Sequence, residues 1–254
     1  LAARVAPTYW ADGVAALQPD SVVIGVKGAW EDLVAARRAC TLPGMKFYYD
    51  PVDQLVDPAR LAAVDGVIAS SWRQYNWLRG ALPIPVFLLP HHADLRIGQR
   101  VDPAAPFRIG YFGVRKNGFL PPAVAAAMDV VEVGSYADVQ WMERLAACPV
   151  HYCVRRKAEK SHSCKPATKL FTAARVGAAV ITTRDESDAE LLLPPDYPFF
   201  CPSRSERAVV ETLDFARASF GTPLFAKAVA DVARIPGWSE DDQCRQLQTL
   251  LCLA

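Results

Sequence analysis

Two lysines four residues apart indicate a site for a phosphate group. Lys165 and Lys169 lie in KPATKLFTAARV (165–176), whose composition and following glycine, Gly177, predict a helix. At this spacing both ammonium groups share one helical face, and the first turns of a helix add free backbone N–H groups that favour anions. The pair therefore predicts a cradle for a pyrophosphate. An ordinary amphipathic helix with solvated lysines is the alternative.

Histidines and cysteines form two matching pairs, which raises the question of a metal site. The sequence contains His151-x-Cys153 and His162-x-Cys164, and both residue types bind zinc. The first pair falls in an expected buried strand, where alternate residues share a face. A spacing of one residue is unusual for zinc, so we favour structural cysteines and predict no metal site.

Sequence motifs of several common enzyme classes are missing. No GxGxxG follows an expected strand, and the glycines of GYFGVRKNG (110–118) have the wrong spacing for a dinucleotide site. The sequence also lacks GxxxxGK[ST], GxSxG and HExxH. A dehydrogenase and a P-loop NTPase are therefore disfavoured.

Charge and composition narrow the class of ligand. Of the 254 residues 52% are hydrophobic, enough for a sizeable core, and the formal net charge is +1. A net charge near zero lacks the basic footprint of a nucleic-acid-binding protein. Between Arg155 and Arg175, however, seven basic residues accompany one acid. A neutral protein with one cationic strip favours a small anionic ligand.

The cysteines and the N-terminus indicate the compartment. The seven cysteines are odd in number and form no CxxC pair, which favours reduced thiols. The sequence shows no signal-peptide pattern and no run of 18 apolar residues. We therefore expect a cytoplasmic protein, with peripheral contact between residues 155–160 and the inner face of a membrane as an open alternative.

Short apolar runs alternate with helical patterns along the chain. The expected strands are 21–26, 45–50, 65–71, 85–90, 107–113, 129–134, 149–154, 178–183 and 197–201. Near-continuous apolar strands separated by helices indicate parallel sheets that are covered on both faces.

The polar segment 91–106 interrupts this alternation. We therefore predict an α/β fold with two Rossmann-like domains, which face each other across a cleft that forms the default ligand site. The predicted parts are an N-terminal domain at 1–95, a linker at 96–106, a C-terminal domain at 107–235 and a C-terminal helix at 236–254.

The segment 165–183 resembles the donor-binding segment of GT-B glycosyltransferases of the group 1 or glycogen-synthase-like superfamily, which use nucleotide sugars. Their pattern is roughly Lys-x-x-Glu-Ala-x-x-x-Gly-x-Pro-Val-Ile, and the sequence matches it at Lys169, Ala173, Gly177, Val180 and Ile181. The motif is degenerate. Thr172 stands where the family has a glutamate that holds the ribose hydroxyls, and Cys164 stands at its partner acid.

Two further segments resemble the same family. FRIGYFGVRKNG (107–118) is similar to the strand and turn that open the C-terminal domain, and Gly113, Arg115 and Lys116 occupy the places of its diphosphate-binding residues. PVFLLPHHADL (85–95) is similar to the hinge, with His91 and His92 at the usual Asn-Gly. The N-terminal half is shorter than the family's acceptor domain.

The resemblance implies a GT-B-like glycosyltransferase that moves a sugar from a nucleotide-diphosphate donor to a glycan, lipid or small-molecule acceptor, without a metal or other cofactor. The implied contacts to the donor diphosphate come from Gly113, Arg115, Lys116, Lys165 and Lys169, and Thr172 lies on the ribose side.

The chemistry of transfer adds two candidate catalytic residues. An inverting transferase needs a carboxylate or histidine as base, and Asp50 follows the expected strand 45–50, with Asp53 close behind. Asp50 is therefore a candidate base or acceptor contact, and His92 is a second candidate. A turn-forming aspartate before Pro51 is the alternative interpretation of Asp50.

Two other functions stay open. The missing glutamates and the short N-terminal half favour a non-catalytic GT-B-like module, which binds a nucleotide or serves as a scaffold for a partner protein. A GT-B-fold sugar epimerase would share the same nucleotide site.

Overall fold

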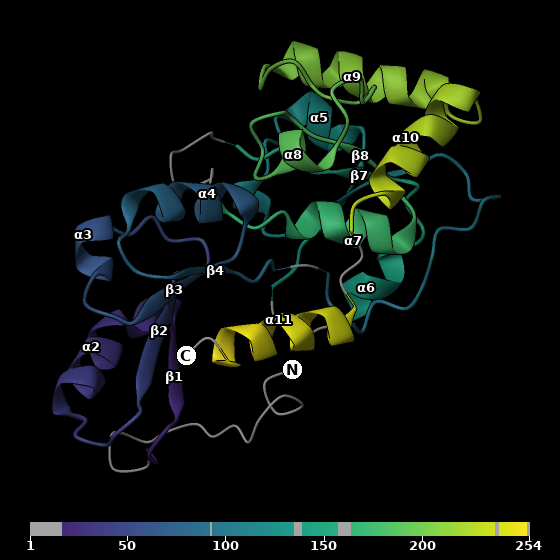
Figure 1. The fold of residues 1–254 in the computed structure, drawn as a ribbon. Coiled ribbons are helices and arrows are strands. Elements are labelled where there is room, and N and C mark those ends of the chain that lie inside the picture. Colours follow the sequence, from purple (N-terminus) through teal and green to yellow (C-terminus); the bar gives the residue numbers. More distant parts are fainter. Residues whose placement is uncertain (1–16, 92, 135–138, 157–163, 237–238, 253–254) are drawn as a thin grey trace. The chain divides into compact units, whose positions relative to one another are not determined.

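The computed structural model describes residues 17–91, 93–134, 139–156, 164–236 and 239–252 (Figure 1). Contacts divide the chain into two compact units. Unit 1 comprises Leu1–His91, Ser163–Pro166 and Trp238–Ala254, and unit 2 comprises His92–His162 and Ala167–Gly237. Each unit contains one parallel four-stranded sheet, so the predicted α/β class with two Rossmann-like sheets is confirmed.

The sheet of unit 1 follows chain order, β1-β2-β3-β4, and all its pairs are parallel. Its elements are β1 (Val22–Val26), η2 (Lys27–Ala29), α2 (Trp30–Ala39), β2 (Lys46–Asp50), α3 (Pro58–Leu61), β3 (Gly66–Ala69), α4 (Trp72–Ala81), β4 (Val86–Leu88) and α11 (Glu240–Cys252). The strands therefore bring Lys27, Asp50 and Ser70 to one edge of the sheet, the edge formed by the carboxyl ends.

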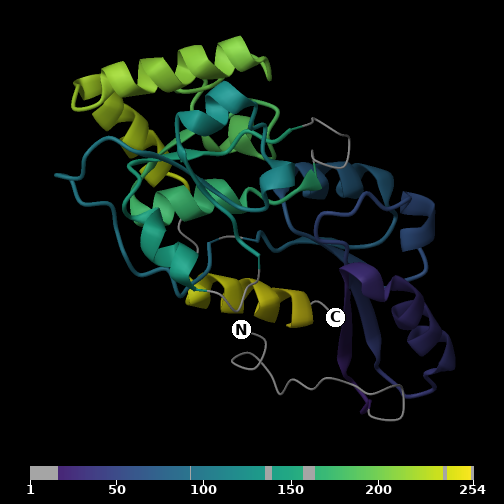
Figure 2. The same cartoon turned by 180° about the vertical axis from the view of Figure 1, so that it is seen from behind.

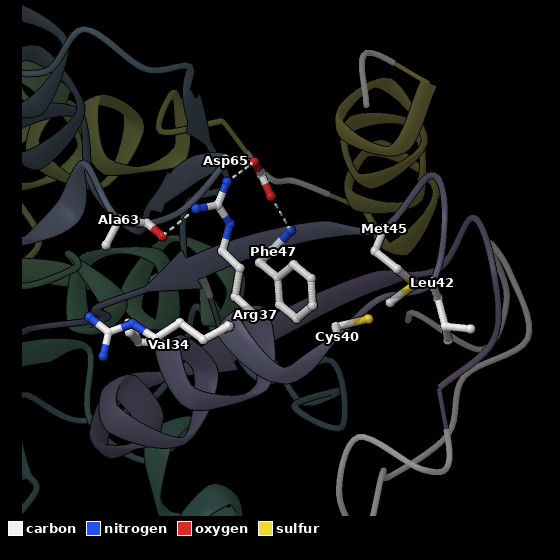
Figure 3. A pocket seen from close by; sticks show the side chains of 9 residues that line it. Val34, Arg37, Cys40, Leu42, Met45, Phe47, Ala63 and Asp65 are labelled. Carbon is white, nitrogen blue, oxygen red and sulfur yellow. Dashed lines mark hydrogen bonds and ion pairs between the residues drawn. The ribbon is translucent and has the colours of Figure 1, made fainter.

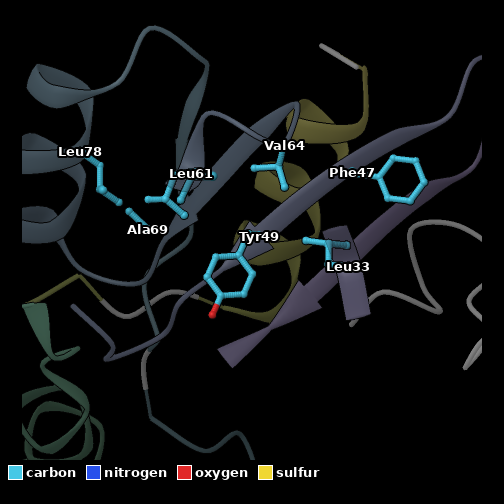
Figure 4. Packing of buried hydrophobic residues seen from close by; sticks show 8 residues of the cluster. Leu33, Phe47, Tyr49, Leu61, Val64, Ala69 and Leu78 are labelled. Atoms are coloured by element: carbon cyan, nitrogen blue, oxygen red, sulfur yellow. The ribbon is translucent and has the colours of Figure 1, made fainter. Parts of the chain in front are cut away.

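Alternate residues of the strands fill the two faces of this sheet. One face packs Phe47, Tyr49 and Ala69 against Leu33 of α2 and Leu78 of α4 (Figure 4). On the other face, Tyr48 and Ile68 pack against Leu250 of α11. The last helix of the chain thus covers a sheet whose strands come from its first third.

The sheet of unit 2 has the order β6-β5-β7-β8, again all parallel. Figure 2 shows this unit from behind, in teal to yellow-green. Its elements are β5 (Ile109–Phe112), η3 (Arg115–Asn117), α5 (Pro122–Ala126), β6 (Asp129–Val131), α6 (Gln140–Leu145), β7 (Val150–Tyr152), α7 (Thr168–Val176), β8 (Ala179–Ile181), α8 (Ala189–Leu192), α9 (Glu206–Ser219) and α10 (Pro223–Ala233). The direction of strand order reverses between β5 and β7, and open parallel sheets bind ligands outside the carboxyl ends at such a point.

Two local predictions are wrong. The helix after β7 begins at Thr168 rather than Lys165, because a residue that precedes a proline, here Pro166, is driven away from helical angles. The expected strand 197–201 is reduced to one bridge between Thr182 and Phe200. Pro198 and Pro202 flank that bridge and have no N–H to extend it.

Helix ends agree with the side chains available to cap them. Ser205 accepts a hydrogen bond from the backbone N–H of Ala208 at 3.2 Å and so begins α9. Gly177 ends α7 in the left-handed conformation, with φ 79°.

The six cysteines whose side chains are described are all free thiols. Among the described helices, none has both the length and the apolar character required to cross a bilayer.

Candidate functional site

The central cation of unit 2 is Lys169, the second residue of α7. Its Nζ lies 3.9 Å from the centre of the Tyr111 ring, on β5. The lysine is half-buried, and within the described part of the chain no carboxylate oxygen lies within ion-pair distance of it. Burial lowers the pKa of Lys169 to about 8. Lys169 therefore presents its ammonium group near the carboxyl end of β5, above the Tyr111 ring.

Gly113 brings backbone to the same ammonium. It follows β5 with φ 149°, a conformation that L side chains rarely adopt, and a Cβ atom placed on it would lie 3.3 Å from Nζ of Lys169. The Gly113 N–H donates to the Val131 carbonyl at 3.1 Å. A side chain at this position would be strained. The two predicted donor-site positions Gly113 and Lys169 thus meet in the structure.

The next predicted donor residues, Arg115 and Lys116, form the short helix η3 directly after this turn. Both side chains are exposed. The backbone N–H of Arg115 lies 3.4 Å from Oε1 of Glu132. Tyr111 reaches this segment as well, since its hydroxyl donates to the Val114 carbonyl at 2.8 Å. The two cations are therefore presented from a turn that is held in place at its base.

Lys165 belongs to the other compact unit of the chain. It precedes α7, belongs to unit 1, and its Nζ is 3.2 Å from Oδ2 of Asp53. The prediction that Lys165 and Lys169 share one helical face is therefore wrong. Thr172 is buried in α7. Contacts from Lys165 to a diphosphate and from Thr172 to a ribose stay predictions.

An ion pair beside the site was missed by the sequence analysis. Nη1 of Arg155 lies 2.8 Å from Oε1 of Glu186, whose side chain is buried. Nη2 of Arg204 is 3.6 Å from the other Glu186 oxygen. Arg155 follows strand β7 and Glu186 follows strand β8. Their positions after two expected strands were the sequence signal that could have identified this pair. The Glu186 carboxylate therefore binds both guanidinium groups.

On unit 1, Asp50 lies beside His91, a pairing that the sequence analysis did not predict. Oδ2 of Asp50 lies 3.4 Å from Nε2 of His91. Oδ1 of Asp50 accepts from the Val52 N–H at 2.8 Å, which confirms the turn-forming role. His92, the second candidate catalytic residue, lies outside the described residues. Asp50 thus has one oxygen in the turn and one beside His91.

Asp53, three residues further along, binds two lysines. Its carboxylate oxygens lie 3.0 Å from Nζ of Lys27 and 3.2 Å from Nζ of Lys165. Burial alone would raise the pKa of Asp53, but hydrogen bonds and charge from the two lysines outweigh it and lower that pKa. The carboxyl end of the unit 1 sheet is therefore a network of paired charges.

The backbone at this edge is strained at two residues that are not glycine. Lys27 has φ 50° and Val52 has φ 56°, a region that costs about 1–3 kcal/mol for such residues. Hydrogen bonds hold both positions, because the Tyr49 hydroxyl donates to the Lys27 carbonyl and the Ser70 hydroxyl donates to the Val52 carbonyl. Strain of this kind gathers at functional edges of folds.

His151 and Cys153, the first pair of the zinc alternative, lie at the end of strand β7. His151 is buried, its Nε2 lies 3.1 Å from the Leu145 carbonyl, and burial lowers its pKa to about 4. Burial also raises the pKa of Cys153 to about 12. Within the described part of the chain, no three His, Cys, Asp or Glu side chains gather as metal ligands do. His162 is outside that part.

A cavity of about 370 Å³ lies at the opposite, amino end of β2 in unit 1 (Figure 3). Arg37 spans it, donating to the Ala63 carbonyl at 2.9 Å and to Asp65 at 2.6 Å. Asp65 in turn accepts from the Phe47 N–H at 2.8 Å. These groups satisfy one another, and the cavity lies away from the carboxyl ends where parallel sheets bind ligands.

Comparison with known proteins gives matches in structure. No protein-family model matches the sequence, and no curated protein matches it. The sucrose-phosphate synthase of Thermosynechococcus elongatus matches with a TM-score of 0.62 and 13% identity, over 91% of this chain and 73% of that one. A glycosyltransferase from Rickettsia africae matches with a TM-score of 0.64 and 11% identity, over 91% and 76%. HepE from Anabaena, solved in complex with UDP, matches with a TM-score of 0.59 and 12% identity, over 91% and 78%.

The chain therefore has the GT-B fold, which the sequence resemblance implied. The matches extend over both units, and the chain spans about three quarters of the length of these three proteins.

Proposed function

We propose that this protein is a glycosyltransferase that binds the diphosphate of a nucleotide sugar in unit 2. The observation that supports it most strongly is Lys169, whose ammonium lies next to the glycine turn at Gly113 without a carboxylate partner among the described residues. A half-buried cation without a counter-ion is costly unless an anion joins it. Arg115 and Lys116 follow in the same turn and add positive charge.

These cations suit the chemistry of glycosyl transfer. When the bond between the sugar and the diphosphate breaks, negative charge develops on the leaving phosphate oxygen. Preformed positive charge at that point lowers the barrier, because it interacts more strongly with the transition state than with the bound donor. Lys169, Arg115 and Lys116 would supply this charge from the protein, so no metal ion is required.

The acceptor side is assigned to unit 1. Asp50 and His91 form a pair in which a carboxylate oxygen lies 3.4 Å from a ring nitrogen. In such a pair the carboxylate holds the imidazole ring in one orientation toward an acceptor. We assign to this pair the contact with an acceptor hydroxyl group. The acceptor class is a glycan, a lipid or a small molecule.

UDP is the first probe for the donor site, since the structurally similar HepE was solved with UDP. Calorimetric titration should give saturable binding of UDP to the wild-type chain. Lys169→Met should weaken that binding about 10- to 100-fold, which corresponds to the loss of one charge-assisted contact.

The matched control is Lys46→Met, which removes a lysine at the start of β2 and should leave the affinity for UDP unchanged. Equal affinity in wild type and Lys169→Met would remove Lys169 from the site. If UDP, GDP, ADP, CMP and dTDP all fail to bind, the proposed function is wrong.

A second candidate function is nucleotide binding without turnover. It is favoured by Thr172 and Cys164, which stand at the two glutamate positions of the resembled motif. A hydroxyl holds a ribose less strongly than a carboxylate does. Measured release of UDP from UDP-sugars separates the two functions. Binding with no release, over a panel of sugars and acceptors, would favour the non-catalytic module.

A further inference from the structure

One buried side chain touches both halves of the proposed diphosphate site. Tyr111 is 1% exposed and lies on β5, directly before the glycine turn. Its ring lies under the Lys169 ammonium at 3.9 Å, and its hydroxyl donates to the Val114 carbonyl at 2.8 Å. Lys169 and Val114 come from different elements, and the tyrosine connects them.

The ring is held rigidly in this position. A Cβ atom on Gly118 would approach Cε2 of Tyr111 to 2.8 Å, so the backbone there packs directly against the ring. The Tyr152 ring on the adjacent strand β7 lies 6.4 Å away, centre to centre. A fixed ring defines where the flexible lysine side chain rests.

An aromatic ring and a carboxylate differ in their effect on the positive charge of a neighbouring lysine. Both attract an ammonium group, and a desolvated cation–π contact is a strong one. A carboxylate would also cancel the positive charge and compete with an incoming anion. The ring positions the ammonium but carries no net charge, so it neither neutralises Lys169 nor repels a phosphate.

We propose that Tyr111 is a positioning residue, whose ring seats the Lys169 ammonium beside Gly113 and whose hydroxyl fixes the turn that presents Arg115 and Lys116 to the diphosphate. This inference rests on the proposed donor-binding function. Burial raises the pKa of Tyr111 to about 12, so the hydroxyl remains a donor at physiological pH.

Two substitutions separate the ring from the hydroxyl. Tyr111→Leu removes both contacts and should weaken UDP binding about 3- to 30-fold. Tyr111→Phe keeps the ring and should lose less affinity. In a Lys169→Met background Tyr111→Leu should have a smaller effect, because the cation that the ring seats is already gone. Tyr152→Phe is the control, since it removes a similar buried hydroxyl that donates to the Phe119 carbonyl at 2.7 Å.

A second measurement needs no nucleotide. An ammonium side chain held over a ring face has its Hε resonances shifted upfield by the ring current. In protein labelled with ¹³C-lysine, the Lys169 signal, identified by its loss in Lys169→Met, should be displaced upfield from the other lysines. The displacement should persist in Tyr111→Phe and disappear in Tyr111→Leu.

The outcomes distinguish this inference from the function on which it rests. If wild type binds no nucleotide diphosphate, the proposed function is wrong and the positioning role is wrong with it, whatever the lysine spectrum shows. If Lys169→Met weakens UDP binding but Tyr111→Leu does not, the donor site stands and Tyr111 has no positioning role. An undisplaced Lys169 signal in wild type overturns the ring contact itself.

Discussion

The Lys165 ammonium lies 3.2 Å from the Asp53 carboxylate, and this ion pair holds the segment that leads into α7. Cys164–Pro166 lie in unit 1, whereas the chain from Ala167 onward belongs to unit 2. The Cys164 carbonyl also accepts from the Ser71 hydroxyl at 3.2 Å. The polypeptide is therefore anchored to unit 1 only three residues before the helix that carries Lys169.

Asp53→Asn should weaken this anchor and lower the free energy of unfolding by about 1 kcal/mol at neutral pH, a value for a partly exposed pair. The folded state lowers the pKa of Asp53. The ionised carboxylate therefore stabilises the folded protein fully above the pKa of the unfolded chain, roughly 4. This stabilisation is lost as the pH falls through the pKa of the folded state. Urea denaturation should therefore show the difference from wild type shrinking below about pH 4.

Asp214→Asn is the matched control, since it breaks an exposed pair with Arg217 at 2.9 Å. It should change stability by less than about 0.5 kcal/mol. A difference between Asp53→Asn and wild type that persists unchanged at pH 3 would contradict the ion-pair explanation.

UDP affinity should depend on pH through Lys169. Its ammonium loses a proton near pH 8, and only the protonated form attracts a diphosphate. From pH 7 to pH 9 the dissociation constant should rise about 10-fold. Lys169→Arg stays charged throughout this range, so its pH profile should be flat. A wild-type profile as flat as that of the arginine variant would refute the titration of Lys169.

Gly113→Ala should destabilise the turn and impair nucleotide binding together. The glycine has φ 149° and its added Cβ would lie 3.3 Å from Lys169 Nζ. The expected loss of unfolding free energy is about 1–3 kcal/mol, with weaker UDP binding by calorimetry. Gly98→Ala should be close to neutral, because an added Cβ would meet no neighbouring atom within 4 Å and the residue does not have a positive φ. Equal behaviour of the two variants would show that the turn tolerates a side chain.

Asp50→Asn tests the acceptor side independently of the donor side. The amide oxygen can still accept from the Val52 N–H, whereas the charge beside His91 is lost. Turnover of the nucleotide sugar should fall about 10²- to 10⁴-fold, and the affinity for UDP should stay at the wild-type value. Asp32→Asn, in the exposed first turn of α2, is the control. Wild-type turnover in Asp50→Asn would exclude a role in catalysis.

Leu250→Ala should destabilise unit 1 through its second sheet face. Leu250 is 2% exposed and packs against Tyr48 and Ile68. A buried leucine truncated to alanine costs about 2–5 kcal/mol. Leu191→Ala, at a side chain that is 55% exposed, should cost less than about 0.5 kcal/mol. If urea denaturation gives similar values for both, α11 adds little to the core.

Local patterns in the sequence predicted most of the fold. Apolar β-branched runs located eight strands to within two or three residues, since such runs are buried on both faces of a parallel sheet. The failure at 197–201 has a local cause, because the apolar residues there are flanked by prolines. The pairing of α11 with the sheet of unit 1 was not predicted, since contacts between distant segments leave no periodic signal in either of them.

Local patterns also account for part of the candidate site. The conformation of Gly113 and its approach to Lys169 follow from strand, turn and helix signals that the sequence carries. The contact between the Lys169 ammonium and the Tyr111 ring does not follow from these signals, because an aromatic residue in a strand normally packs in the core. Likewise, the four-residue spacing from Lys169 predicts Lys165 on the same helix. Its ion-pair partner Asp53 is far away in the sequence, so no spacing indicates the contact.

The position of α11 also sets an order for folding during synthesis. The strands of unit 1 leave the ribosome first, but Leu250 follows only after all of unit 2 has been made. At typical elongation rates, Tyr48 and Ile68 wait roughly 10–30 s for their covering helix. During that interval unit 2 can fold on the ribosome, while the nascent sheet of unit 1 presents an apolar face to chaperones and to neighbouring chains.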